Sequence, residues 1–174
     1  MNQEAELSKY DEAASYMAIL ESLYSETSDN NLTQLTSEFW NSWHNLSNMP
    51  TGYAERLAVY DAGARLAEQF QWLNDNMLSL EVDLADEVQA GIDQINILSK
   101  QIAEVNVDII SNSINNNPND LLDKRNALVS ELSQYINLQV YEQSNNSLTV
   151  ATTTGHILVY GADTFDLEMR SGQV

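Results

Sequence analysis

The sequence predicts a mainly α-helical protein with a small antiparallel β region, an elongated helical bundle followed by a β-meander. Apolar residues recur at steps of three or four through the first three-quarters of the chain. The stretch from about residue 53 to 114 contains no proline. After Asn137 the apolar residues alternate with polar ones, as in strands. We therefore place a coiled-coil-like helical rod in residues 1–136. The β region occupies residues 137–174 and is expected to be truncated at its C-terminal end.

Two helices are expected before the long one. In the first, an apolar stripe runs over residues 7–24, and the polar cluster 25–29 should end it. The second fits residues 32–46. Residues 49–52 should end that helix, because Pro50 disfavours helical conformation at the residue before it.

Three aromatic side chains of the second helix, Phe39, Trp40 and Trp43, lie at helical spacing. Such a group could be a platform for a ligand. Aromatic side chains carry a large apolar area, however, and at this spacing they are more often part of a core. We therefore expect all three to be buried.

A single very long helix is predicted for residues 53–114. Its most regular part carries an apolar series with a mean step of about 3.6 residues: Met77, Leu80, Leu84, Val88, Ile92, Ile95, Leu98, Ile102, Val105 and Ile109. At 1.5 Å per residue, a helix of this length would span about 90 Å. Gly63 and Gly91 each cost about 1 kcal/mol relative to alanine, so we expect them to mark close helix approach or a bend.

The polar run 111–118 should break the long helix. Asn117 is placed to cap the next helix, with Pro118 at its first position, and this helix should reach residue 136. Strands are then expected around 138–140, 148–150, 156–160 and 165–169, with a turn at 144–147; these ranges predict a four-stranded antiparallel meander.

The composition excludes several classes of function. The chain has 174 residues, with 26 acidic against 7 basic side chains and a net charge of −19. Binding to nucleic acid, or to an anionic membrane surface, requires many basic side chains. With only seven, neither nucleic acid nor a membrane is expected as a partner. Absent cysteines exclude disulfides and thiolate metal sites. No run of 18 apolar residues predicts a transmembrane helix. We interpret the acidity as a solvated surface.

No residue pattern predicts catalysis or ligand binding. His44 and His156 have no carboxylate three or four residues away on a helix face, so a metal site is not expected. Asn115, Asn117 and Asn119 resemble the start of a calcium loop, but the glycine and glutamate that such a loop needs are missing. Phosphate-binding loops and nucleophile elbows are also absent. We therefore expect no catalytic, cofactor-binding or metal residues, and we expect that the chain is not an enzyme.

Four groups of residues resemble the flagellar hook-associated protein 1 family, in matching order and spacing. They are FWNSWHNLSNMP at 39–50, AER at 54–56 with ARLAEQF at 64–70, DQIN at 93–96 with KQIAEVN at 100–106, and NDLLDKR at 119–125. The last is the most specific. Asn126 departs from the family, which commonly has aspartate there. Thr51-Gly52 also departs from the usual turn rich in serine and aspartate.

The resemblance implies a structural role in the bacterial flagellum, at the junction between hook and filament, where it supports filament assembly. It implies an extracellular protein, exported through the flagellar secretion apparatus, that needs no cofactor. The implied partners are the hook protein, the second hook–filament junction protein, copies of itself in the assembled tube, and an export chaperone for the full-length chain. Nucleic acid and membrane are not among them.

Family members begin with an assembly-forming segment and end with a partner helix. Residues that resemble either segment do not occur here, so we expect this chain to be a core fragment of the family. We also expect it to be monomeric in dilute solution. The alternative is an extracytoplasmic helical-bundle binding or sensory module. It would share the acidic surface and the long helices, and flanking transmembrane helices in the full gene would distinguish it.

Overall fold

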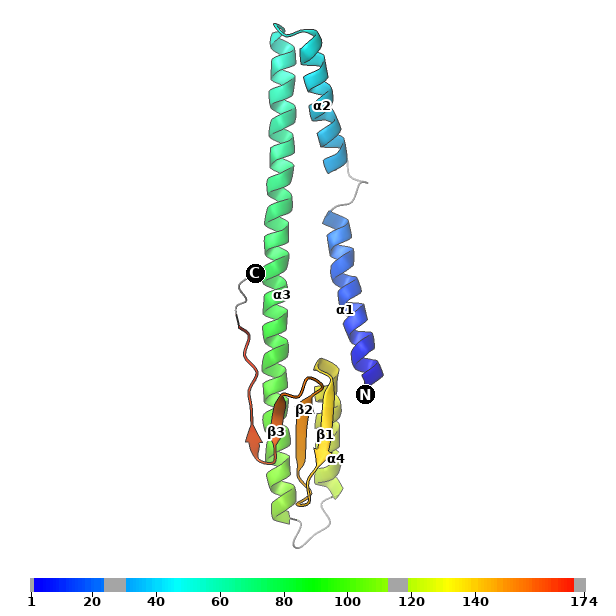
Figure 1. The fold of residues 1–174 in the computed structure, drawn as a ribbon, viewed down its shortest axis with the longest axis vertical. Helices are drawn as coiled ribbons and strands as arrows, with labels where there is room; N and C mark the ends of the chain where they lie inside the picture. The colour runs from blue at the N-terminus through cyan, green and yellow to red at the C-terminus, as the bar shows by residue number, and fades with distance from the viewer. Residues whose placement is uncertain (1, 24–30, 113–118, 171–174) are drawn as a thin grey trace. The chain divides into compact units, whose positions relative to one another are not determined.

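The computed structural model describes residues 2–23, 31–112 and 119–170 and is mainly helical, with one antiparallel sheet (Figure 1). The described helices are α1 (Asn2–Leu23), α2 (Leu32–Asn48), α3 (Tyr53–Asn112) and α4 (Asn119–Tyr135). The described strands are β1 (Leu138–Glu142), β2 (Leu148–Thr152), β3 (Ile157–Tyr160) and β4 (Asp163–Thr164). The predicted fold class is confirmed, and so is the very long helix, since α3 has 60 residues.

The chain packs as two compact units. We call Ala13–Leu84 the hairpin unit, and Met1–Glu12 together with Ala85–Val174 the sheet unit. The predicted boundary between residues 136 and 137 falls inside the sheet unit, where it marks the change from helix to strand.

In the hairpin unit, hydrogen bonds define both ends of α2. Asn31 caps it, because its side-chain Oδ1 accepts a hydrogen bond from the Gln34 amide at 2.7 Å. At the other end the Met49 amide donates to the carbonyls of Asn45 and Leu46. The guanidinium of Arg56 then donates to the Pro50 carbonyl oxygen, at 2.8 Å from Nη2, and so ties the turn to the first turn of α3.

The buried apolar side chains of α2 and α3 in the hairpin unit are small or aliphatic. Leu35, Ala62 and Leu73 are buried. The Phe39 ring lies 3.4 Å from the place where a Cβ of Gly63 would lie, which is an ordinary van der Waals contact, so close helix approach or a bend at this glycine stays a prediction. At Gly91, in the sheet unit, no described atom lies within 4 Å of such a Cβ, so close approach is wrong there, and the alternative, a bend, stays a prediction.

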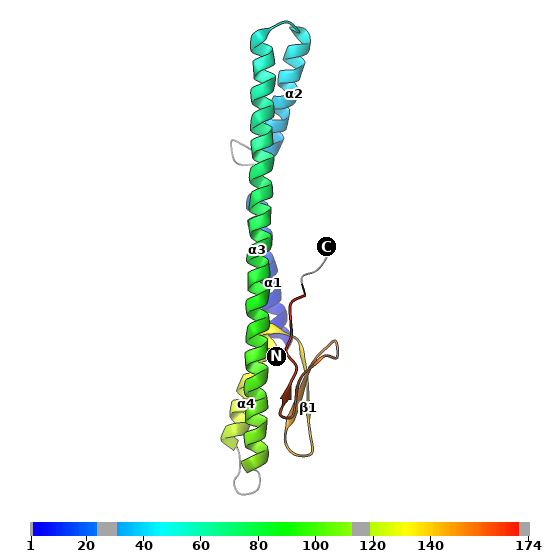
Figure 2. The same ribbon diagram turned by 90° about the vertical axis from the view of Figure 1, so that its left-hand side faces the viewer.

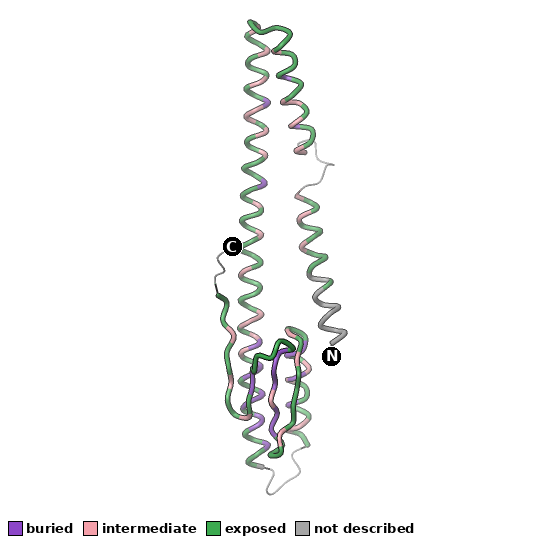
Figure 3. Tube along the Cα trace, in the orientation of Figure 1, coloured by how far each residue is buried: buried purple, intermediate pink, exposed green. Residues whose placement is uncertain are grey.

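The apolar series on α3 changes its burial along the helix (Figure 3). Met77, Leu84 and Val88 are exposed. Its last members, from Ile95 to Ile109, are buried. The period therefore predicted the helix, whereas the covering sheet and α4 decide where the helix is buried.

In the sheet unit, α3 and α4 form one layer and a four-stranded antiparallel sheet forms the other (Figures 1 and 2). The strand order is β1-β2-β3-β4, so β1 and β4 stand at the edges. Val140 pairs with Val150, and Val150 pairs with Val159, with an irregularity after Val150. The predicted turn at 144–147 is confirmed between β1 and β2.

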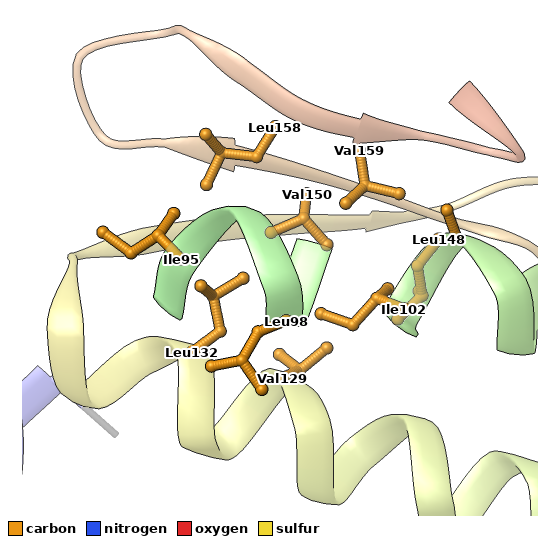
Figure 4. Packing of buried hydrophobic residues seen from close by; sticks show 10 residues of the cluster. Ile95, Leu98, Ile102, Val129, Leu132, Leu148, Val150, Leu158 and Val159 are labelled. Carbon is orange, nitrogen blue, oxygen red and sulfur yellow. The ribbon is translucent and has the colours of Figure 1, made fainter. Parts of the chain in front are cut away.

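A compact apolar cluster joins the two layers (Figure 4). Its members come from α3, α4, β2 and β3; they are Ile95, Leu98, Ile102, Ala103, Val129, Leu132, Leu148, Val150, Leu158 and Val159. A small sheet is marginal alone in water. Burying each large aliphatic side chain contributes about 1.5–3 kcal/mol, so this cluster stabilises the meander on the helices.

The predicted fourth strand is misplaced. β4 has only two residues, and the segment predicted as strand, 165–169, has no strand conformation. Its backbone pairs with a side chain instead: the Asn96 carboxamide donates to the Leu167 carbonyl at 2.9 Å and accepts from the Leu167 amide at 2.8 Å. Lys100 also binds Asp166 at 2.8 Å. These bonds hold the segment along α3, although its alternation resembles that of a strand.

The predicted cap Asn117 and the calcium-like residues Asn115 and Asn117 lie outside the described residues. In α1, which confirms the first predicted helix, Tyr10 and Met17 of the predicted stripe are exposed.

Candidate interaction surfaces

The two histidines belong to different units. His44 lies on α2 in the hairpin unit, His156 lies just before β3 in the sheet unit, and both are exposed. Within the described ranges, no cluster of three or more histidine, aspartate or glutamate side chains could hold a metal ion. That the chain has no catalytic, cofactor-binding or metal residues stays a prediction.

One open depression of about 480 Å³ lies where α2 ends and α3 begins. It is lined by Asn45, Asn48, Met49, Ala54, Glu55 and Ala58. Binding sites for small molecules are usually enclosed, with mainly apolar walls and a few convergent polar groups. Small and polar side chains around an open depression do not form such a site.

The face of α3 turned away from α2 carries exposed apolar side chains. Tyr53, Leu57 and Tyr60 follow one another at steps of four and three, which places them on one face of the helix. They are 82%, 47% and 73% exposed. Leu78 and Val82 continue the same face and are also exposed. We call these five residues the outer stripe.

The two tryptophans of α2 are exposed, so their predicted burial is wrong. Trp40 is 63% and Trp43 47% exposed. The helix turns Leu35 and Ser42 toward α3, and at 100° per residue Trp40 lies about 140° away from Leu35. The Phe39 ring meets both indoles edge-on, with centroids 5.3 and 6.3 Å apart. An aromatic cluster therefore lies at the surface of the hairpin unit.

The outer face of the sheet carries two exposed tyrosines. Tyr141 of β1 and Tyr160 of β3 both pair with Thr149 of β2, so the three side chains form one row across the sheet. The Tyr141 hydroxyl donates to Gln139 Oε1 at 2.8 Å. Amphipathic aromatic side chains of this kind are enriched in protein–protein interfaces.

These surfaces were missed from the sequence, although a signal was present. The steps from Tyr53 to Leu57 and from Leu57 to Tyr60 form a second apolar face on the helix, apart from the apolar series that starts at Met77. Exposed apolar patches on a folded chain usually mark contacts with other proteins. Of the described helices, none combines the length and apolarity required to cross a membrane. Fold and surfaces together define a mainly helical module with exposed apolar side chains.

Residues 17–173 match the family model described as the flagellar hook-associated protein FlgK helical domain. The chain belongs to this family.

Two curated relatives carry the name flagellar hook-associated protein 1. The chain is 28% identical to the Bacillus subtilis protein over 158 residues, which cover 86% of this chain and 30% of that protein. It is 31% identical to the Escherichia coli protein over 140 residues, which cover 78% of this chain and 25% of that protein. The chain thus spans less than a third of the length of these relatives.

A solved structure, the flagellar hook junction protein FlgK from Burkholderia pseudomallei, has a similar fold. The TM-score is 0.82 at 25% identity, over 95% of this chain and 28% of that chain. The predicted family and the predicted combination of long helix and antiparallel sheet are confirmed by these matches.

Proposed function

We propose that the chain is a structural part of the bacterial flagellum, which forms the junction between hook and filament and supports filament assembly. The match of residues 17–173 to the helical domain of a flagellar hook-associated family carries this proposal. The names of the curated relatives support it, and so does the similar fold of a flagellar hook junction protein.

The exposed surfaces support a role in assembly. The outer stripe, the indoles of α2 and the tyrosine row offer exposed apolar contact area, which suits packing against other proteins. The partners we propose are the hook protein, the second hook–filament junction protein and further copies of the chain. A chaperone would accompany the longer protein during export.

The proposed location is outside the cell, in the flagellum, after export through the flagellar secretion apparatus. In this role the protein needs no cofactor or metal and is not an enzyme. The division of the chain into a helical part, residues 1–136, and a small β region, residues 137–174, also remains a proposal.

The test is deletion of the gene in the source bacterium. We expect cells that lack attached filaments and do not swim, and we expect the intact gene to restore both. Cells that keep full, attached filaments after the deletion would overturn the proposal.

A second complementation tests the surface. The gene carries Tyr53→Ser, Leu57→Ser and Tyr60→Ser, which change exposed side chains of the outer stripe. The control carries Ala64→Ser and Ala67→Ser, two small side chains between the apolar groups of this face. We expect the control to restore filaments and the triple variant to assemble poorly. Normal swimming of the triple variant would exclude the outer stripe from assembly.

A further inference from the structure

The sheet unit buries a polar side chain among apolar ones. Asn106 of α3 is fully buried, and Val105 and Ile109 on the same helix are buried beside it. A carboxamide in such surroundings is strongly destabilising unless its donors and acceptor are satisfied.

Asn106 is fully satisfied. Its Nδ2 donates to the carbonyl oxygens of Leu148 at 3.0 Å and Gly161 at 2.8 Å. Its Oδ1 accepts from the Leu148 amide at 3.0 Å and from Arg125 Nη1 at 3.4 Å. Both donors and both lone pairs are therefore in use. Through its donor and its acceptor, the carboxamide binds both backbone groups of Leu148 at the start of β2.

The second member is Arg125 of α4, which is only 3% exposed. Its Nη1 donates to the Asn146 carbonyl oxygen at 2.6 Å, and Nη2 lies 4.0 Å from Glu142 Oε1. Burial lowers the pKa of Arg125, and the carboxylate of Glu142 partly opposes this shift. Among the described residues, Arg125 Nε has no hydrogen-bond partner. The buried guanidinium of Arg125 thus makes a charge-assisted hydrogen bond to the Asn146 carbonyl oxygen, and such a bond depends on the position of its acceptor.

The two turn carbonyls belong to residues of the same unusual conformation. Asn146 has φ of 64° in the β1–β2 turn, and Gly161 has φ of 60° in the β3–β4 turn. Left-handed backbone is uncommon for non-glycine residues. In an antiparallel meander these two turns lie at the same end of the sheet. Asn106 and Arg125 thus bind one end of the meander at both of its turns.

We propose that Asn106 and Arg125 form a polar lock that positions the meander on α3 and α4 by binding its two left-handed turns. Apolar contacts are not directional, and a strand that slips by two residues keeps its apolar face inward. The aliphatic cluster therefore favours attachment of the sheet without fixing its position. The hydrogen bonds to Asn146, Leu148 and Gly161 select one position of the sheet on the helices.

The test uses amide hydrogen exchange measured by NMR on the chain of residues 1–174. Asn106→Leu and Arg125→Met replace each side chain with an apolar one of similar size, alone and together. We expect exchange to accelerate about 10- to 100-fold at Asn146, Leu148 and Gly161 in each single variant. In the double variant the acceleration of exchange should be smaller than the product of the two single accelerations, because the two side chains are hydrogen-bonded to each other.

A matched control is Asn96→Leu. Asn96 lies on the same helix and makes the same two-bond pair, but with Leu167, away from both turns. In this control variant, amide exchange should accelerate at Leu167 and remain unchanged at Asn146, Leu148 and Gly161.

The proposal is overturned if Asn106→Leu accelerates exchange at Leu148 alone, or if the two substitutions act independently. If Asn106→Leu does not fold, the pair Arg125→Lys and Arg125→Met decides. Lysine keeps the cation and one donor, so exchange at Asn146 and Gly161 should rise less than with methionine. The lock is contradicted if the two arginine variants show equal exchange rates at Asn146 and Gly161. It is also contradicted if neither variant exchanges faster there than the unsubstituted chain.

Discussion

Ile102→Ala should destabilise the sheet unit more than any exposed substitution on α3. Ile102 is fully buried in the apolar cluster between the helices and the sheet. The substitution removes three carbon atoms, which at about 0.8 kcal/mol each lowers the free energy of unfolding by about 2.4 kcal/mol. The cavity left behind adds to this, and isoleucine-to-alanine changes in cores cost about 2–5 kcal/mol. We expect about 3 kcal/mol.

The assay is urea unfolding followed by far-ultraviolet circular dichroism. With a urea dependence of about 2 kcal/mol per molar, a loss of about 3 kcal/mol lowers the midpoint by about 1.5 M. Amide exchange at Val150 and Val159, which pair across β2 and β3, assigns the loss to the sheet unit.

The control is Ile97→Ala, which changes the same residue type five positions earlier on the same helix. Ile97 is 48% exposed, so little apolar area is lost and alanine gains a few tenths of a kcal/mol in helix propensity. We expect a change within about 0.5 kcal/mol. Equal losses in the two variants, or a loss below about 1 kcal/mol for Ile102→Ala, would refute the assignment of the core.

Three further outcomes are expected. Gly91→Ala should raise the free energy of unfolding by about 1 kcal/mol, because alanine is the better helix former and its methyl group meets no described atom within 4 Å; an unchanged or lower urea midpoint contradicts this. Asn31→Ala should cost about 1 kcal/mol by removing the cap of α2, whereas Asn31→Asp should keep most of it, and equal losses would disprove the capping role. At low micromolar concentration, light scattering should give the mass of one chain, since the charge of −19 repels copies; a stable ring would contradict it.

The secondary structure could be predicted because periodicity is a local property of the chain. The step from Ile95 to Leu98 and on to Ile102 identifies a helix whatever covers it. The alternation around Val140 and Val150 identifies strands in the same way. The predicted second helix also began at the observed residue, Leu32, because the apolar spacing that predicts it starts there.

The errors concern contacts between segments distant in sequence. Trp40 has the spacing of a core residue, but which face of α2 is covered depends on where α3 packs. Residues 165–169 alternate as a strand does, but the side chain of Asn96, about 70 positions earlier, pairs with their backbone instead. Neither outcome is encoded in the local pattern.

The polar lock left traces that could be recognised only afterwards. Asn106 is a polar residue between Val105 and Ile109 on the buried face of α3, which predicts a hydrogen-bonding role without naming a partner. Arg125 closes the string at 119–125, the most specific part of the family resemblance. Its burial against a turn 21 residues later could not be read from spacing.

In the part of the chain that the structure describes, β1 is an edge strand, and this has a consequence for handling the protein in acid. An edge strand exposes unpaired backbone groups that can join another sheet, and charge is a common protection against such aggregation. β1 carries the exposed apolar side chains Val140 and Tyr141, with Glu142 at its end. The sequence pI is about 4.1, so the repulsion between chains vanishes near that pH. Neutral buffers keep the edge strands of different chains apart, and solutions brought close to pH 4 should become turbid.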